Sequence, residues 1–230
     1  MNLIDLEDKI SVKFKNKALL EQALTHRSYL NESHNKITGS NERLEFLGDS
    51  VLSLVTSNYL YQKFADIPEG DLTNLRASLV KTQTLARVSQ SINLGDYLFL
   101  SHGEEESGGR NHISILADSL EALIGAIFLD RGLATCTDFI SQFIFPVLPE
   151  IIKNGLFRDF KSILQENIQK ETKKSPDYKV LKTTGPDHER VFTVGVFIND
   201  KQMGEGSGHS KQEAQQAAAK AALEKPPPLR

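Results

Sequence analysis

The chain has few of the sequence features that are typical of membrane proteins or of proteins from oxidising compartments. Among its 230 residues, Cys136 is the one cysteine and tryptophan is absent. A single cysteine cannot form an internal disulfide, which excludes a disulfide-stapled fold and favours a reducing compartment. No apolar run approaches the roughly 20 residues that a membrane span needs, and the N-terminus lacks the pattern of a signal peptide. We therefore expect a cytoplasmic protein with no membrane partner.

The net charge of −3 conceals an uneven distribution along the chain. Residues 1–157 contain 14 Lys and Arg against 20 Asp and Glu, whereas residues 158–230 contain 13 against 10. The first part thus carries a net charge of −6 and the second part +3. An acidic body followed by a mildly basic part indicates two parts with different tasks. The overall charge therefore does not exclude a nucleic-acid partner.

The hydrophobic periodicity changes near residue 153. Before it, apolar residues recur at helical spacing and strand-like alternation is nearly absent. After it come a short helical pattern, two alternating segments, a segment at 201–208 that could begin or complete a third strand, and an alanine-rich helical pattern. We predict an all-α domain over 1–152, a linker over 153–157, a small α+β domain of order α-β-β-β-α over 158–226, and a disordered tail over 227–230. The polar segment 101–112 is predicted to be a mobile loop, with a helix start at Glu104 to Glu106 as the alternative.

Two acid-bearing segments carry the candidate chemistry. Glu42, Glu45 and Asp49 share one face of a predicted helix, which taken alone is typical of a solvated surface. Residues 115–129 are apolar at eleven positions, yet include Asp118 and Glu121 one turn apart. No Lys or Arg adjoins this pair in the sequence, and burying unpaired carboxylates is costly. A positive charge from elsewhere must balance them.

A divalent cation is one source of that charge. Hard oxygen ligands completed by water are what Mg²⁺ or Mn²⁺ prefers, and the four candidate ligands are Glu45, Asp49, Asp118 and Glu121. Such a site favours attack of an activated water on a phosphodiester. The alternative is that distant arginines such as Arg43 or Arg76 neutralise the pair, or that it faces a crevice.

Phe46 indicates a further contact. On the predicted helix it lies beside the acids and away from the leucines, so a monomer would expose it. Either a second copy of the chain covers it, giving a homodimer, or residues 22–32 form a local pocket around it.

Four stretches of the chain together resemble bacterial ribonuclease III. The stretch 41–50, NERLEFLGDS, resembles the signature of that family. ALTHRSYLNE at 23–32, PEGDLTNLRASLV at 68–80 and ILADSLEALIGAIFLDRG at 115–132 occur in the family's order and spacing. Residues 158–226 resemble a double-stranded RNA-binding domain.

The resemblance implies a metal-dependent endoribonuclease that acts as a homodimer on double-stranded RNA. It implies Mg²⁺, with Mn²⁺ as a substitute, and products with 5′-phosphates, 3′-hydroxyls and short 3′ overhangs, in the processing of ribosomal, messenger and transfer RNA precursors. It assigns catalysis to Asp49 and Glu121 among the four ligands. It assigns RNA positioning to Glu42 and Glu69, for which a solvated charge and a helix-start acid are the alternatives, and contact with the partner subunit to Phe46.

In the C-terminal part, the resemblance implies RNA contacts that read duplex shape and phosphates. The residues at the matching positions are Gln165, Glu166, His188, Ser210 and Lys211. Ser210 with Glu213 also forms a capping box at the start of the last helix. Gln212 and Gln215 stand where the family commonly carries lysines, which predicts a modest or more magnesium-dependent affinity. A non-catalytic RNA-binding regulator and a hydrolase of small phosphate compounds remain the alternatives.

Overall fold

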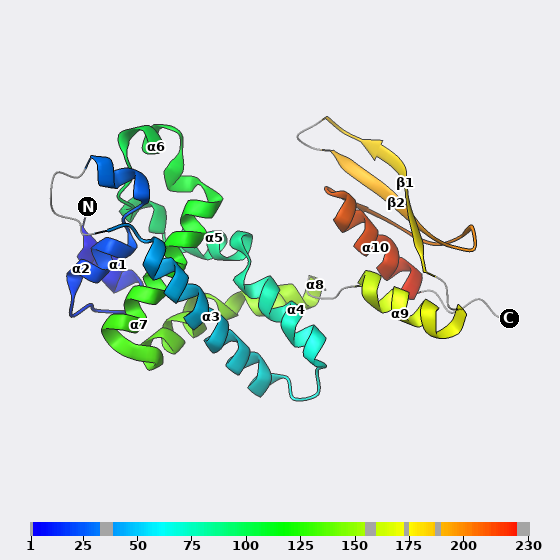
Figure 1. Cartoon of the computed structure of the whole chain (residues 1–230), viewed down its shortest axis with the longest axis horizontal. Helices are drawn as coiled ribbons and strands as arrows, with labels where there is room; N and C mark the ends of the chain where they lie inside the picture. Colours follow the sequence, from blue (N-terminus) through cyan, green and yellow to red (C-terminus); the bar gives the residue numbers. More distant parts are fainter. Residues whose placement is uncertain (1, 33–38, 155–159, 173–174, 187–189, 225–230) are drawn as a thin grey trace. The chain divides into compact units, whose positions relative to one another are not determined.

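The computed structural model describes residues 2–32, 39–154, 160–172, 175–186 and 190–224, which fall into two compact units (Figure 1). Unit 1 spans Met1–Phe157 and unit 2 spans Arg158–Arg230. Helix α8 (Leu148–Asn154) continues two residues beyond the predicted end of the first domain at 152. The rest of the predicted linker and the predicted tail at 227–230 lie outside the described residues.

Unit 1 is helical, as the periodicity predicts. Its described helices are α1 (Leu3–Lys9), α2 (Lys17–Ala23), α3 (Glu42–Lys63), α4 (Glu69–Val80), α5 (Thr82–Ser91), α6 (His102–Glu106), α7 (Ile113–Phe143) and α8, with 3-10 turns η1 (Arg27–Asn31), η2 (Leu94–Tyr97), η3 (Gly109–Asn111) and η4 (Phe145–Val147). In the described part of this unit, strand-like pairing is limited to one isolated bridge between Thr25 and Phe99. No described helix is long and apolar enough to cross a membrane.

Helices α3 and α7 cross with their backbones in direct contact at the centre of unit 1. A Cβ atom added to Gly48 of α3 would lie 1.7 Å from the carbonyl oxygen of Glu121 on α7. A Cβ atom added to Gly125 of α7 would lie 2.2 Å from the carbonyl oxygen of Leu44 on α3. Only glycine allows this approach, because any side chain would overlap the facing backbone. The crossing brings the acidic turn of α3 against the acidic turn of α7.

A short segment after α2 fixes where α3 begins. The N–H of Asn41, the residue before α3, donates to the carbonyl of Thr25 (2.9 Å). On its other side the segment pairs with Phe99, whose carbonyl accepts the N–H of His26 (3.0 Å). Ser28 then accepts the N–H of Ser101 through its hydroxyl (3.1 Å). The start of α3 and the chain before α6 are therefore held by one common segment.

The prediction of a loop at 101–112 is wrong, because the segment forms α6 and η3. Ser101 caps α6 by accepting the N–H of Glu104 (3.2 Å). Arg110 donates to the Glu105 carboxylate (2.7 Å) and to backbone carbonyls of η2 and the residue that follows it (2.9 and 3.0 Å). The polar composition that indicated a loop supplies the hydrogen bonds that order it.

Unit 2 has the predicted order α-β-β-β-α. Its elements are α9 (Phe160–Thr172), β1 (Asp177–Thr184), β2 (Val191–Ile198), β3 (Lys201–Gly208) and α10 (Lys211–Leu223). The antiparallel sheet has the order β1-β2-β3. Its small core joins the sheet to both helices through Leu164, Ile168, Val194, Val196 and four alanines of α10.

Candidate active site

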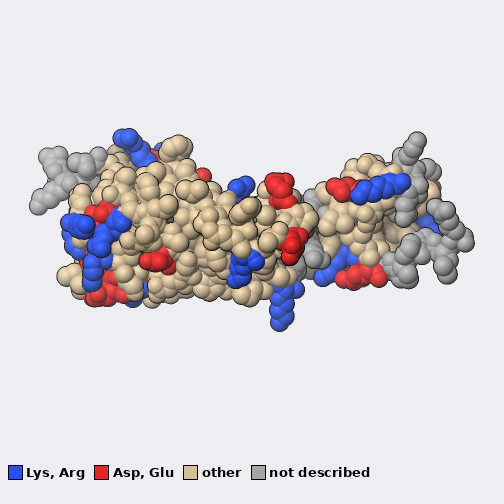
Figure 2. All heavy atoms as spheres, turned by 90° about the horizontal axis from the view of Figure 1, so that it is seen from below, with Lys and Arg blue, Asp and Glu red and all other residues tan. Residues whose placement is uncertain are grey.

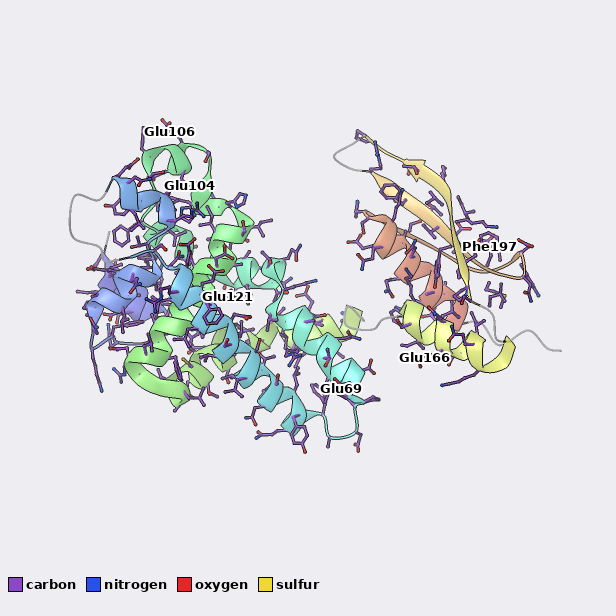
Figure 3. The ribbon with its side chains drawn as sticks, in the orientation of Figure 1. Glu69, Glu104, Glu106, Glu121, Glu166 and Phe197 are labelled. Carbon is purple, nitrogen blue, oxygen red and sulfur yellow. The ribbon has the colours of Figure 1, made fainter. Side chains whose placement is uncertain are left out.

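Three carboxylates meet where α3 and α7 cross. One carboxylate oxygen each from Glu45, Asp118 and Glu121 lies within 4.8 Å of the other two. All three side chains are half-buried, and Figure 3 places Glu121 on α7 where it passes α3. Glu45 thus meets two acids that lie more than 70 residues later in the sequence, and we call the three the acidic cluster.

Burial and mutual repulsion raise the pKa values in the acidic cluster. Burial raises the pKa of Glu121 to about 8, with further increases from Asp49, Glu45 and Asp118. Burial also raises the pKa of Glu45, and the charge of Asp118 adds to it. For Asp118, burial raises the pKa while the charges of His26 and His112 oppose the increase. The cluster therefore holds more negative charge than its surroundings balance.

Arginine does not neutralise these acids in the described part of the chain. No ion pair there joins Lys or Arg to the three carboxylates. Arg76 instead donates to the Ser57 hydroxyl (3.0 Å), and Arg43 is exposed. The cluster consists of hard oxygen donors without sulfur or nitrogen, which fits a divalent cation such as Mg²⁺ or Mn²⁺.

Asp49 lies at the edge of the acidic cluster. It is exposed one turn after Glu45 on α3 and is not among the three acids that approach within 4.8 Å. Its charge nevertheless acts on Glu121 more strongly than that of either other acid. The structure thus brings three of the four predicted ligands together and places the fourth beside them.

Glu42 and Glu69 lie outside the cluster. Glu42, exposed at the start of α3, accepts the Ser40 hydroxyl (2.8 Å) and lies 3.7 Å from Arg27. Glu69, exposed at the start of α4, accepts the Thr73 hydroxyl (2.9 Å), and Figure 3 shows it apart from Glu121. Their assignment to RNA positioning stays a prediction.

Phe46 is 78% exposed, so the alternative that residues 22–32 form a pocket around it is wrong. Leu54 repeats at the helical spacing of Leu44, Leu47 and Val51, which predicts that it shares their apolar face, yet its side chain is 58% exposed. Tyr61 on the same helix is 75% exposed. On the face of unit 1 seen in Figure 2, acidic and basic side chains are interspersed, without a continuous basic patch.

In unit 2, the described candidates for RNA contact are exposed. Gln165 and Glu166 lie on α9, and Lys211 lies in the first turn of α10. His188 is outside the described residues. The Ser210 half of the predicted capping box is confirmed, because the Ser210 hydroxyl accepts the N–H of Glu213 (3.1 Å). The Glu213 carboxylate accepts the N–H of His209 (2.9 Å), one residue before the cap.

The two glutamines of α10 differ in their surroundings. Gln212 is exposed, whereas Gln215 is half-buried and accepts the ammonium of Lys161 on α9 (2.7 Å). Gln215 is therefore part of the contact between the two helices.

Sequence reasoning missed the residues that bring the acids together. Gly48 and Gly125 interrupt helical patterns, and an isolated glycine in such a pattern is a signal of close backbone approach. His26 and His112 carry no metal-ligand spacing that would single them out, although their charges act on Asp118.

Comparison with known proteins finds a family match in each of the two units. Residues 16–148 match the family model described as Ribonuclease-III-like, and residues 160–225 match the double-stranded RNA binding motif. The chain is 44% identical to Ribonuclease 3 of Treponema denticola, over 96% of this chain and 90% of that protein. It is 45% identical to Ribonuclease 3 of Clostridium perfringens, over 98% and 94%.

A solved structure adds a match in three dimensions. The nuclease domain of ribonuclease III from Campylobacter jejuni, described for flexibility in a region involved in dimer formation, is 45% identical. It superposes with a TM-score of 0.60 and covers 64% of this chain and 99% of that domain.

A helical nuclease domain with an acidic cluster, followed by a double-stranded RNA-binding motif, defines the class as RNA endonucleases. The chain belongs to the ribonuclease III family. It is a double-strand-specific endoribonuclease.

Proposed function

We propose that the chain cleaves RNA duplexes with Mg²⁺ held by the acidic cluster and by Asp49 at its edge. The observation that carries this proposal is the group of three carboxylates within 4.8 Å, two from α7 and one from α3. Burial raises the pKa of Glu121 to about 8. A raised pKa is expected for a carboxylate ligand whose charge no cation balances. Mn²⁺ prefers the same donors and is expected to substitute.

The chain's own residues would divide the work. Glu45 and Asp118 hold the cation from opposite helices. Glu121 must lose a proton to become a ligand, and Asp49, exposed beside it, is the acid that solvent and RNA can reach. We assign catalysis to Asp49 and Glu121. A bound divalent cation supplies Lewis acidity, which favours attack by water on the phosphodiester and stabilises the charge that develops.

The products we expect have 5′-phosphate and 3′-hydroxyl ends with short 3′ overhangs. Precursors of ribosomal RNA, and some messenger and transfer RNA precursors, are the expected substrates. The buried free Cys136 is compatible with action in the reducing cytoplasm. The functional division that we propose is a nuclease domain over 1–152, a linker over 153–157 and an RNA-binding domain over 158–226.

A homodimer is the proposed active form. Phe46 projects from the helix that carries Glu45 and Asp49 and is 78% exposed, so a partner subunit would remove a large aromatic surface from water. The dimer-forming region named for the Campylobacter relative supports this proposal. Glu42 and Glu69 would then position RNA between the two subunits.

Unit 2 is proposed to bind the duplex by shape. Minor-groove contacts are assigned to Gln165, Glu166 and His188, and phosphate contacts to Ser210 and Lys211. The start of α10 supports the phosphate assignment, because helix N-termini favour anions. Gln212 and Gln215 stand where lysines would supply cations for phosphate, which supports a modest affinity.

Glu121→Gln tests the proposed chemistry. The variant keeps the size of the side chain but removes the ligand charge, so we expect duplex binding to persist and Mg²⁺-dependent cleavage to be lost. Gel-shift and cleavage assays on one perfect RNA duplex measure both, with single-stranded RNA as the substrate control. Glu106→Gln is the matched variant, since Glu106 lies on α6 away from the cluster (Figure 3). Undiminished cleavage by Glu121→Gln would contradict the proposal.

A further inference from the structure

The ammonium of Lys161 lies where three elements of unit 2 meet. Lys161 is half-buried in the first turn of α9, and its Nζ donates to the side-chain oxygen Oε1 of Gln215 on α10 (2.7 Å). The same Nζ lies over the ring of Tyr178 on β1, 5.1 Å from the ring centroid. In the described part of the chain, no carboxylate forms an ion pair with Lys161. Its contacts are a neutral amide and an aromatic ring, which hold the side chain without cancelling its charge.

The backbone of Lys161 is held by the same stretch of α10. Its N–H belongs to the first turn of α9, where amide groups lack partners within the helix, and it donates to Oε1 of Gln216 (3.3 Å). The neighbouring Phe160 packs on the small core of unit 2, and the ammonium of Lys220 lies 5.7 Å from its ring centroid. Side chains of α10 thus fix the first turn of α9 through both its backbone and its side chains, and Figure 1 shows the two helices side by side.

This contact lies between the two groups of proposed RNA contacts. Gln165 follows Lys161 by four residues, one turn later on α9, and Glu166, labelled in Figure 3, comes next. On α10, Gln215 lies one turn after Lys211, the residue at which the helix begins. The contact between Lys161 and Gln215 therefore joins the helix assigned to the minor groove with the helix whose start is assigned to phosphate.

We propose that Lys161 is a positioning residue for RNA recognition, which sets the distance between the minor-groove contacts of α9 and the phosphate contacts at the start of α10. The inference rests on the proposed RNA contacts of unit 2. A domain that reads a duplex by shape contacts minor grooves and the intervening phosphates at once, so its two contacting helices must keep a fixed spacing. The α10 side of the core consists of four alanines, whose methyl groups form shallow ridges that resist sliding of α9 only weakly. The directional hydrogen bonds of Lys161 supply the missing restraint.

Two substitutions at Gln215 separate positioning from electrostatics. Gln215→Met keeps the length of the side chain and removes the acceptor, whereas Gln215→Glu keeps an acceptor and adds a negative charge. If Lys161 acts through its position, Gln215→Glu binds duplex RNA more tightly than Gln215→Met does. We expect Gln215→Met to lose about tenfold in affinity, the size expected for one hydrogen bond to a charged group. If only the charge near phosphate mattered, Gln215→Glu would lose affinity and Gln215→Met would not.

Fluorescence anisotropy of the full chain on a labelled RNA duplex measures these affinities. A chelator prevents cleavage, and the temperature is held well below the thermal unfolding transition of each variant. Lys161→Met should show the same loss as Gln215→Met, and the double variant should lose no more than either single one, because the two residues share one contact. Gln202→Met is the matched control with wild-type affinity, since Gln202 donates to Glu205 (2.9 Å) on β3, a strand without proposed RNA contacts.

Wild-type affinity of folded Gln215→Met would show that the contact serves stability alone, and would overturn the proposal. Tighter binding by Gln215→Met than by Gln215→Glu would overturn it as well. Lys211→Met separates this failure from that of the proposed RNA contacts, because it removes an assigned phosphate contact directly. If Lys211→Met bound the duplex as the wild type does, that assignment would itself be wrong, and the inference about Lys161 would fall with it.

Discussion

Gly48 lies so close to Glu121 that a Cβ atom on the glycine would be 1.7 Å from the glutamate's carbonyl oxygen. This contact sets the distance between the two helices that carry the acids. A wider crossing would separate Glu45 from Asp118 and Glu121 and open the cluster. The absence of a side chain at one position thus determines the geometry of charged side chains at three others.

Gly48→Ala is expected to destabilise the protein. The added methyl group must push α3 away from α7, and overpacking of this kind costs about 1–3 kcal/mol in the free energy of unfolding. Urea unfolding followed by circular dichroism measures the change. Gly70→Ala is the matched control, because Gly70 lies in α4 with no atom within 4 Å of its added Cβ. For Gly70→Ala we expect no loss of stability, and a small gain because alanine is a better helix former than glycine. Equal effects of the two substitutions would contradict the close crossing.

The stability of the metal-free protein is expected to fall as pH rises. Burial raises the pKa of Glu121 from 4.5 to about 8, so between these values the folded state binds a proton that the unfolded state has lost. The protonated Glu121 therefore contributes to the free energy of unfolding. This contribution is fully present below pH 4.5 and is lost as the pH rises through about 8. Unfolding in urea with a chelator present, over this range, measures the slope.

Glu121→Gln provides the control for that slope. The amide cannot titrate, so the difference between wild type and variant isolates the contribution of Glu121. Mg²⁺ should flatten the wild-type slope, because the bound cation balances the carboxylate charge. A slope that is identical in wild type and variant would show that Glu121 has an ordinary pKa.

The sequence predicts the elements of the site better than their assembly. The acids Asp118 and Glu121 stand out in an apolar helix because a charged group there needs a partner, and local spacing is enough to see this. Their closeness to Glu45 depends on two glycines in different helices, which no single window of sequence connects. The prediction of a loop at 101–112 fails for the same reason, since Arg110 orders the segment through backbone carbonyls more than ten residues away in the sequence.

Phe46→Ala is expected to shift the proposed dimer towards the monomer without unfolding the chain. The side chain is 78% exposed in the single chain, so its removal leaves no cavity within the fold. Analytical ultracentrifugation measures the dimer dissociation constant, and thermal unfolding of the monomer reports the fold. Ile4→Ala is the comparison, because Ile4 is an apolar residue of α1 that is 59% exposed. A Phe46→Ala variant that dimerises as tightly as the wild type would remove Phe46 from the interface.

The two glutamines of α10 are expected to respond differently to replacement by lysine. Gln212 is exposed in the first turn of α10, beside Lys211, so a lysine there can reach phosphate. Each added phosphate contact makes the slope of log affinity against log salt steeper by about 0.9 for B-form DNA, and we expect a change of that order on duplex RNA. At Gln215 a lysine would meet the ammonium of Lys161, which now lies 2.7 Å from the amide oxygen. Gln215→Lys should therefore lower the stability of unit 2 and add little affinity.

Fluorescence anisotropy on labelled duplex RNA at several salt concentrations measures the slopes. A steeper slope for Gln215→Lys than for Gln212→Lys would reverse the assignment.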